Sequence, residues 1–172
     1  MMNKLKKIVL LAFITVSTIA FSQTKESALN DATATVKANL NMDFETVVKH
    51  TLPAVLDMMG GKEAALKVLK STMESAKAQG LVIEKADVIS VSKITKEQGQ
   101  SRCIMKGYTE MTMSGQRVKS TIHFVGIYND VDNYWWFVEA KQLKNEVLAN
   151  KIAPNFETSL EIPEDDVQVE EL

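Results

Sequence analysis

The stretch SRCIMKGYTEMTMSGQRVKSTIHFVGIYN, residues 101–129, alternates side chains on both sides of Ser114 and Gly115. A period of two is typical of β-strands, and a short Ser-Gly link between two such runs is typical of a hairpin. The stretch therefore predicts two long antiparallel strands. On one face of the first strand we expect Cys103, Met105, Gly107, Thr109, Met111 and Met113. On the other face we expect Lys106, Tyr108, Glu110 and Thr112.

The returning strand is expected to divide in the same way. One face would carry Val118, Ser120, Ile122, Phe124, Gly126 and Tyr128, and the other Arg117, Lys119, Thr121, His123, Val125 and Ile127. Residues 81–95, rich in Val and Ile, predict a preceding strand, with a polar turn at residues 96–100. After the polar sequence NDVDN, the sequence YWWFVEA predicts a fourth strand. Short connections favour an antiparallel meander.

The residues before this sheet predict helices. Apolar residues recur at near-helical spacing over residues 27–40, with Ser27 placed as the cap. A second helix is expected to begin after Asp43, which is a good N-cap. Pro53 interrupts it, so residues 53–59 predict either a separate short helix or a kinked continuation.

The sequence DMMGGKEAAL, residues 57–66, is superficially like a phosphate-binding loop. However, Val55 stands where the first glycine belongs, Glu63 stands where Ser or Thr belongs, and the preceding residues predict a helix instead of a strand. We interpret Gly60 as the left-handed residue that ends one helix, and Gly61 as the junction to the next. That helix is expected to end at Gly80.

Helices followed by an antiparallel sheet predict an α+β fold in which the helices cover one face of a curved sheet. We expect a signal peptide at residues 1–22, a folded domain at residues 23–163 and an acidic disordered tail at residues 164–172. The tail contains five acids and no Lys or Arg, which favours a solvated segment.

The first residues have the three parts of a secretory signal. Lys4, Lys6 and Lys7 precede an uncharged apolar run at residues 8–21, and Ser22 offers a small residue for cleavage. A membrane anchor is the alternative, but a spanning helix needs about 20 consecutive apolar residues. We therefore expect an exported protein, periplasmic or secreted, without a stable membrane anchor after cleavage.

Charge and composition exclude several functions. The formal net charge is −2, and cleavage after Ser22 would remove three lysines and no acids, leaving −5. An acidic protein is a poor partner for nucleic acid, because nucleic-acid binding depends on many Lys and Arg contacts. The single Cys103 cannot form an internal disulfide and is expected to be a small buried hydrophobe. No cluster of His, Cys, Asp and Glu has ligand-like spacing, so we expect neither metal nor cofactor.

The order of elements, together with PAVLDMMGGKEAALKVL, NDVDNYWWFVEA and IAPNFETSLEIPE, resembles small exported bacterial members of the nuclear transport factor 2-like superfamily, over about residues 27–163. The resemblance implies a cystatin-like cone, in which N-terminal helices pack into a strongly curved antiparallel sheet open to a pocket at one end. The superfamily includes ketosteroid isomerase, scytalone dehydratase, limonene epoxide hydrolase, polyketide cyclases and non-catalytic binding proteins. Their catalytic residues cannot be matched here one by one, so the resemblance implies a fold and a pocket.

The predicted ligand site combines apolar side chains with a few polar ones. It comprises Tyr108, Met111, Met113, His123, Phe124 and Trp136, with ordinary core packing as the alternative. Gly107 and Gly126 could bend the sheet and leave space in a cup. His123 could act as an acid or base if it faced the interior, but it shares strand parity with Arg117 and Lys119, which favours a solvated surface position.

We therefore expect an exported, non-catalytic binding or interaction domain with a pocket for an apolar or amphipathic small molecule. The alternative is an isomerase or lyase acting on a hydrophobic small molecule, with His123, Tyr108 or Glu139 as acid or base. Two of these three groups in one buried cavity would favour the enzyme. We also expect a homodimer formed through the outer face of the sheet. This face is expected to be more apolar than a solvated strand face needs, with Thr121, Val125, Ile127, Trp135 and Phe137 on it.

Overall fold

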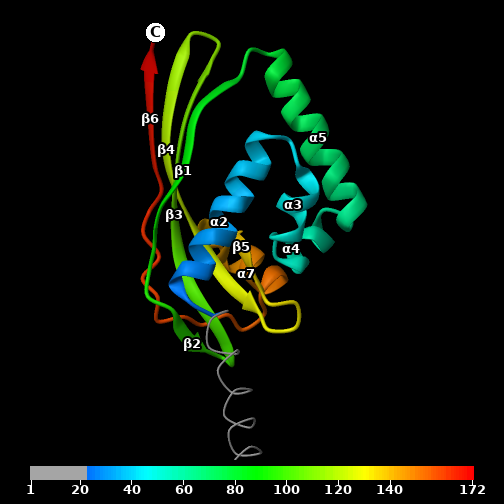
Figure 1. Ribbon diagram of the computed structural model, residues 1–172, viewed down its shortest axis with the longest axis vertical. Coiled ribbons are helices and arrows are strands. Elements are labelled where there is room, and N and C mark those ends of the chain that lie inside the picture. The colour runs from blue at the N-terminus through cyan, green and yellow to red at the C-terminus, as the bar shows by residue number, and fades with distance from the viewer. Residues whose placement is uncertain (1–22) are drawn as a thin grey trace, which may run out of the picture.

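The computed structural model describes residues 23–172, so the predicted signal peptide lies outside the described residues. Helices come first, then an antiparallel sheet, then two short helices and a last strand. The helices are α2 (Lys25–Leu40), α3 (Phe44–Lys49), α4 (Pro53–Met58), α5 (Lys62–Ala78), α6 (Ala140–Lys144) and α7 (Glu146–Ile152). The strands are β1 (Val82–Val91), β2 (Thr95–Glu97), β3 (Gln100–Met113), β4 (Gln116–Asn129), β5 (Tyr134–Glu139) and β6 (Asp166–Glu171). The α+β prediction is confirmed (Figure 1).

Helix ends follow local capping chemistry. α2 begins before the predicted start, because Thr24 is its N-cap and exchanges hydrogen bonds of 3.1 Å with Ser27 in a capping box. Asp43 caps α3 as predicted, accepting from the Thr46 N–H at 3.3 Å. Gly60 has a φ of 91° and Gly61 a φ of 92°, which confirms that this pair is helix punctuation.

The chain between α3 and α4 makes them separate helices. Thr51 forms a parallel bridge with Phe137, and the Leu52 N–H donates to the Phe137 carbonyl at 3.3 Å. The chain therefore leaves α3 to pair with the outer edge of β5, and α4 starts afresh with Pro53 in its first turn.

The sheet has the predicted antiparallel order β1-β3-β4-β5 and is not closed. Ser114 and Gly115 form the predicted hairpin turn, with φ values of 53° and 79°. The polar segment expected as one turn contains another hairpin. Gln98 and Gly99 also have positive φ, at 49° and 78°, so β2 pairs with the start of β3.

The C-terminal segment differs from the disordered tail that we expected. Its six β6 residues are all exposed, but they pair with residues 116–121 of β4. β5 pairs with residues 124–129 on the same edge, so β6 occupies the part of that edge which β5 leaves free. An unpaired edge offers backbone hydrogen bonds to any extended segment that can reach it. The Lys119 Nζ to Glu170 Oε1 contact of 2.9 Å adds an ion pair.

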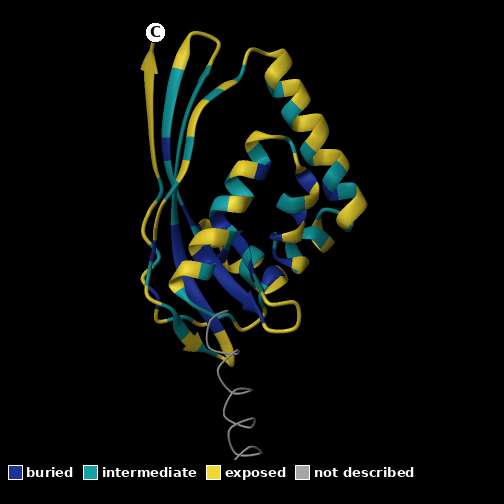
Figure 2. Cartoon of the chain, viewed as in Figure 1, coloured by how far each residue is buried: buried dark blue, intermediate teal, exposed yellow. Residues whose placement is uncertain are grey.

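Side chains from both faces of the sheet are buried, because each face is covered. On the side of α2 the buried cluster contains Ala28, Ala32, Val91, Cys103, Met105, Tyr128, Trp135 and Phe137. On the opposite face it contains Leu52, Ile104, Val125, Ile127, Val138, Ala140, Leu143, Ile152 and Leu160. Figure 2 shows most of the buried residues gathered in the half of the molecule near α2 and α7, whereas most residues of α5 and of the far half of the sheet are half-buried or exposed.

The apolar set that we expected on one outer face is divided between the two covered faces. Tyr128 pairs with Trp135 and Ile127 with Trp136, so Trp135 and Phe137 point to the helix side while Val125 and Ile127 point away from it. All of these except Thr121 are buried. The predicted homodimer therefore loses the surface that motivated it and stays a prediction.

Candidate functional site

A cavity of about 260 Å³ lies between α2 and the helix-facing side of β1, β3 and β4. Its walls are mainly apolar and include Ala32, Val36, Met105, Ile122, Phe124 and Phe137. An apolar protein cavity of about 150 Å³ is known to accept benzene. The cavity therefore has room for a small organic molecule.

Gly107 keeps this cavity open on the sheet side. A Cβ atom on Gly107 would meet only ordinary contacts, 3.7 Å from both the Ile122 carbonyl oxygen and Phe124 Cε2. Gly107 pairs with Ile122, and its neighbour Met105 pairs with Phe124, so these residues form one patch of the helix-facing side. A longer side chain at position 107 would fill space that is now empty.

A second cavity, of about 210 Å³, shares part of this wall. Val47, Phe124 and Phe137 line both cavities. The second cavity continues between α3, α4 and α5, where Val55, Leu56 and Leu69 line it. The interior between the helices and the sheet thus contains two apolar spaces separated by two phenylalanine rings and a valine.

The first cavity has few polar groups on its walls. Thr35, Asn39 and Thr109 line it. The Thr35 hydroxyl donates to the Asp31 carbonyl at 2.8 Å. The half-buried Asn39 carboxamide has no hydrogen-bond partner among the described residues. Asp87 also lines the cavity, but its carboxylate lies 3.4 Å from Lys85 Nζ.

The predicted ligand-site residues are spread over several places. Phe124 lines both cavities and Tyr108 lines the first. The Tyr108 hydroxyl donates to Glu110 at 3.2 Å. Met111 and Met113 lie further along β3 toward the hairpin, outside the first cavity, and Met113 is exposed. Trp136 is on the opposite face of the sheet and packs against the buried cluster of that face, which contains Leu52, Val125, Ile127 and Leu160 and is called the outer core below.

His123 is buried, so our expectation of a solvated position is wrong. The C-terminal segment crosses this part of the sheet, and Asp165 Oδ1 accepts from the His123 N–H at 2.8 Å and lies 3.3 Å from Nδ1. His123 lines a groove of about 760 Å³ on the face of the sheet opposite α2. The strand face of His123 was predicted correctly, since Lys106 and Thr121 line the same groove. The sequence analysis did not predict that the C-terminal segment would cover this face.

The three acid or base candidates do not meet. Tyr108 lines the first cavity, Glu139 the second, and His123 the groove on the other face. Glu139 is further engaged by Lys141 at 3.0 Å. Cys103 is fully buried as predicted, and burial raises the pKa of its thiol to about 12, which removes the thiolate needed for nucleophilic chemistry.

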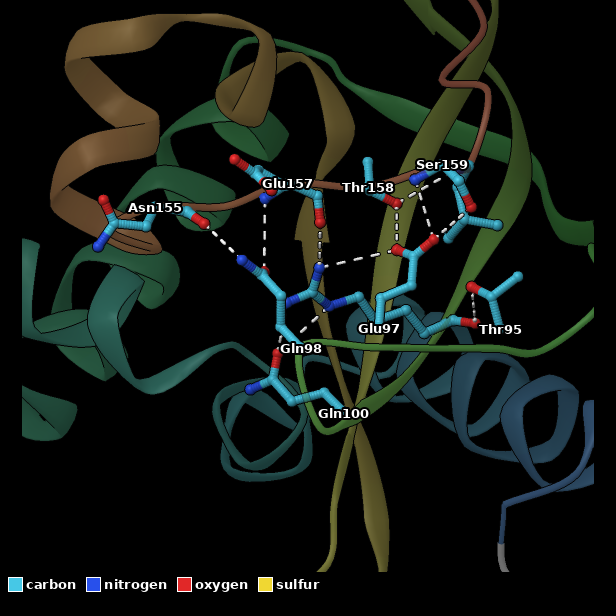
Figure 3. Close-up of polar contacts among 10 residues, drawn as sticks. Thr95, Glu97, Gln98, Gln100, Asn155, Glu157, Thr158 and Ser159 are labelled. Atoms are coloured by element: carbon cyan, nitrogen blue, oxygen red, sulfur yellow. Dashed lines mark hydrogen bonds and ion pairs between the residues drawn. The ribbon is translucent and has the colours of Figure 1, made fainter.

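A buried polar network that sequence reasoning missed lies at the β2–β3 hairpin (Figure 3). Arg102 is 3% exposed and donates to the Glu157 carbonyl at 2.7 Å and to Gln98 and Gln100 at 2.8 Å each. Glu97 lies 3.8 Å from Arg102 and accepts from the Thr158 hydroxyl at 2.6 Å. The network ties residues 157–159 to the sheet. An arginine within a strand-like alternation was the only sequence signal for it.

Residues 23–172 contain no group of three or more His, Cys, Asp or Glu arranged to hold a metal ion, and no helix among them is both long and apolar enough to cross a membrane. Comparisons of the chain with protein-family models, curated proteins and solved structures found no match.

Proposed function

We propose that the protein is an exported, non-catalytic binding module that holds a small apolar or amphipathic molecule between α2 and the sheet. The observation that carries this proposal is the unfilled apolar cavity next to Gly107. Close packing is the norm in protein interiors, with few voids larger than a water molecule. An apolar space of this size, whose lining includes the exposed Leu40, is a natural ligand site.

The arrangement of the elements supports placing this module among the cone-shaped folds of the nuclear transport factor 2-like superfamily. α2 lies along the side toward which the sheet bends (Figure 1). The cavity lies between that helix and the strands, which is where the resemblance implies a pocket. Export belongs to the same proposal and depends on the signal-like pattern of residues 1–22.

The alternative function, an isomerase or lyase, has no comparable support among residues 23–172. Acid–base catalysis requires a group within hydrogen-bond reach of the substrate proton. Of the three candidates, only Tyr108 borders the first cavity. Strand parity places its side chain on the opposite side of the sheet, where its hydroxyl donates to Glu110. A binding role needs no such group.

The test is a thermal-shift screen of the purified protein against small apolar and amphipathic compounds, followed by native mass spectrometry. A ligand that binds only the folded state, at 100 times its dissociation constant, adds about 2.7 kcal/mol to the free energy of unfolding. The control is Gly107→Leu, because leucine at this position would occupy the cavity. We expect compounds that stabilise the wild type and leave Gly107→Leu unchanged. Equal shifts in both proteins, or none in the wild type, would contradict the proposal.

A further inference from the structure

The first cavity changes character along its length. At one end its walls are the buried residues Ala32, Met105 and Phe137. At the other end they include the half-buried Asn39 and Thr109 and the exposed Leu40. α2 and β3 run in the same direction in Figure 1. Ala32 and Met105 are the first residues of these two elements to line the cavity, so they mark one end of it. Asn39 and Thr109 are among the last and mark the other end. The closed end is therefore apolar and the open end is polar.

The polar groups at the open end can both donate and accept hydrogen bonds. The Asn39 carboxamide has two N–H donors and one carbonyl acceptor, and no described residue engages them. The Thr109 hydroxyl, which can do both, likewise has no hydrogen-bond partner among the described residues. Thr35, one helical turn before Asn39, donates to Asp31 and keeps acceptor capacity. A ligand group that matches these partners must itself donate and accept.

The charges around the cavity favour an uncharged ligand. No lysine, arginine or histidine is among its described lining residues. Asp87 is the only ionisable carboxylate among them, and Lys85 already pairs with it at 3.4 Å. Lys85 and Asp87 share strand parity with Tyr108, on the side of the sheet away from α2. Withdrawing a charge from water without an oppositely charged partner is unfavourable. At the half-buried Asn39 a carboxylate or ammonium group would lose part of its hydration and gain no such partner among the lining residues, so we expect it to bind less tightly than a neutral group.

We propose that the ligand is a neutral amphipathic molecule, with its apolar part against Met105 and Phe124 and a hydroxyl or amide group at Asn39. This inference rests on the proposed function and narrows it to one class of ligand. A hydroxyl or primary amide satisfies the donors and acceptors of Asn39 and Thr109 without carrying a charge into the cavity. Asn39 is thus the residue that selects the head group.

The experiment compares four probes with the same eight-carbon chain: 1-octanol, octanamide, octanoate and octylamine. Dissociation constants are measured by isothermal titration calorimetry at neutral pH, where octanoate and octylamine are charged. We expect octanol and octanamide to bind at least tenfold more tightly than the two ions. If octanoate or octylamine binds as tightly as octanol, the inference fails while the proposed function stands. If no probe binds, and the wider screen also yields no ligand, both fail.

A matched pair of α2 variants tests the role of Asn39. Asn39→Leu removes the polar group at the open end, whereas Asn30→Leu makes the same change at an exposed position of the same helix. We expect Asn39→Leu to weaken octanol and octanamide binding about three- to tenfold, as loss of one hydrogen bond would. Asn30→Leu should bind both probes as the wild type does. Unchanged octanol affinity in Asn39→Leu would overturn the assignment of the head group to this residue.

Discussion

The Sγ atom of Cys103 lies 2.7 Å from the position that a Cβ atom would take on Gly126. These two residues pair directly across β3 and β4. The Phe137 and Trp135 rings close the same space at 3.3 and 3.4 Å. Real Cβ atoms do not approach other heavy atoms as closely as 2.7 Å. Gly126 is therefore a packing residue, at which even a methyl group would force the core to shift.

We expect Gly126→Ala to lower the free energy of unfolding by about 1–3 kcal/mol, the usual cost of overpacking a core. Urea denaturation measures this loss. Cys103→Ala removes the closest obstacle, so the double variant should lose less than the sum of the two single losses. Strict additivity of the two substitutions would contradict the steric explanation.

Gly107 should respond in the opposite way. Its added Cβ atom would have only ordinary contacts, and its φ is not positive, so alanine can adopt the native backbone without strain. We expect Gly107→Ala to be neutral or to stabilise the protein by about 0.4–1 kcal/mol, because alanine restricts the unfolded chain more than glycine does. The same urea denaturation measures it. A loss as large as that of Gly126→Ala would show that the space beside Gly107 is not open.

The two glycines show how far the sequence could predict the site. Alternation over residues 101–129 correctly predicted both strands and their hairpin, and it placed Cys103 with Gly107 on one face of the first strand. The structure shows that Gly126 of the second strand shares this face. The sequence also suggested that both glycines leave space. Only the neighbours across the sheet decide this, and Trp135 and Phe137 come from β5, whose register with β4 is not encoded in either strand alone.

The C-terminal segment shows a second limit of prediction from the sequence. Its acidic composition correctly indicated exposure, since every β6 residue is exposed. Composition does not reveal that β4 extends beyond β5 and leaves an edge for pairing. Covering of the sheet by residues from the far end of the chain also buried His123, Val125 and Ile127, although their strand parity alone was compatible with a solvated face.

The Glu97 carboxylate should make stability depend on pH. Burial acts to raise the pKa of Glu97, but hydrogen bonds from Ser159 and Thr158 and the charge of Arg102 outweigh it, so the pKa lies below its ordinary value of 4.5. As pH falls from the ordinary value of 4.5 toward the lowered pKa, the unfolded state therefore binds more protons than the folded state. The stabilisation by Glu97 is complete above this range and is lost as pH falls through the lowered pKa.

We expect the free energy of unfolding of the wild type to fall more steeply below about pH 5 than that of Glu97→Gln, which cannot ionise at this position. Urea denaturation at a series of pH values between about 3 and 7 measures the difference. Glu74→Gln, at an exposed position of α5, is the matched control and should follow the wild type. Parallel curves for the wild type and Glu97→Gln would remove the role of Glu97 in acid stability.

The C-terminal segment should contribute to stability through its part before β6. Leu160 is 8% exposed and belongs to the outer core with Val125 and Ile127, while Val167 of β6 is 60% exposed. We expect Leu160→Ala to cost about 2–5 kcal/mol, because it removes buried methyl groups and leaves a cavity. Val167→Ala, on the same segment, should change stability by no more than about 0.5 kcal/mol.

Truncation after Pro163 separates the two parts of this segment. It removes β6 and Asp165 but keeps Leu160 and the residues that Arg102 and Glu97 bind, so we expect a folded protein with a single cooperative urea transition. Truncation after Pro154 also removes Leu160 and the Glu157 carbonyl, which uncovers the outer core and leaves the buried Arg102 without one of its acceptors. That loss should exceed about 4 kcal/mol, since one buried leucine alone accounts for about 2–5 kcal/mol and natural domains have only about 5–15 kcal/mol in total. Equal stability of the two truncated proteins would mean that residues 155–163 do not hold the outer core together.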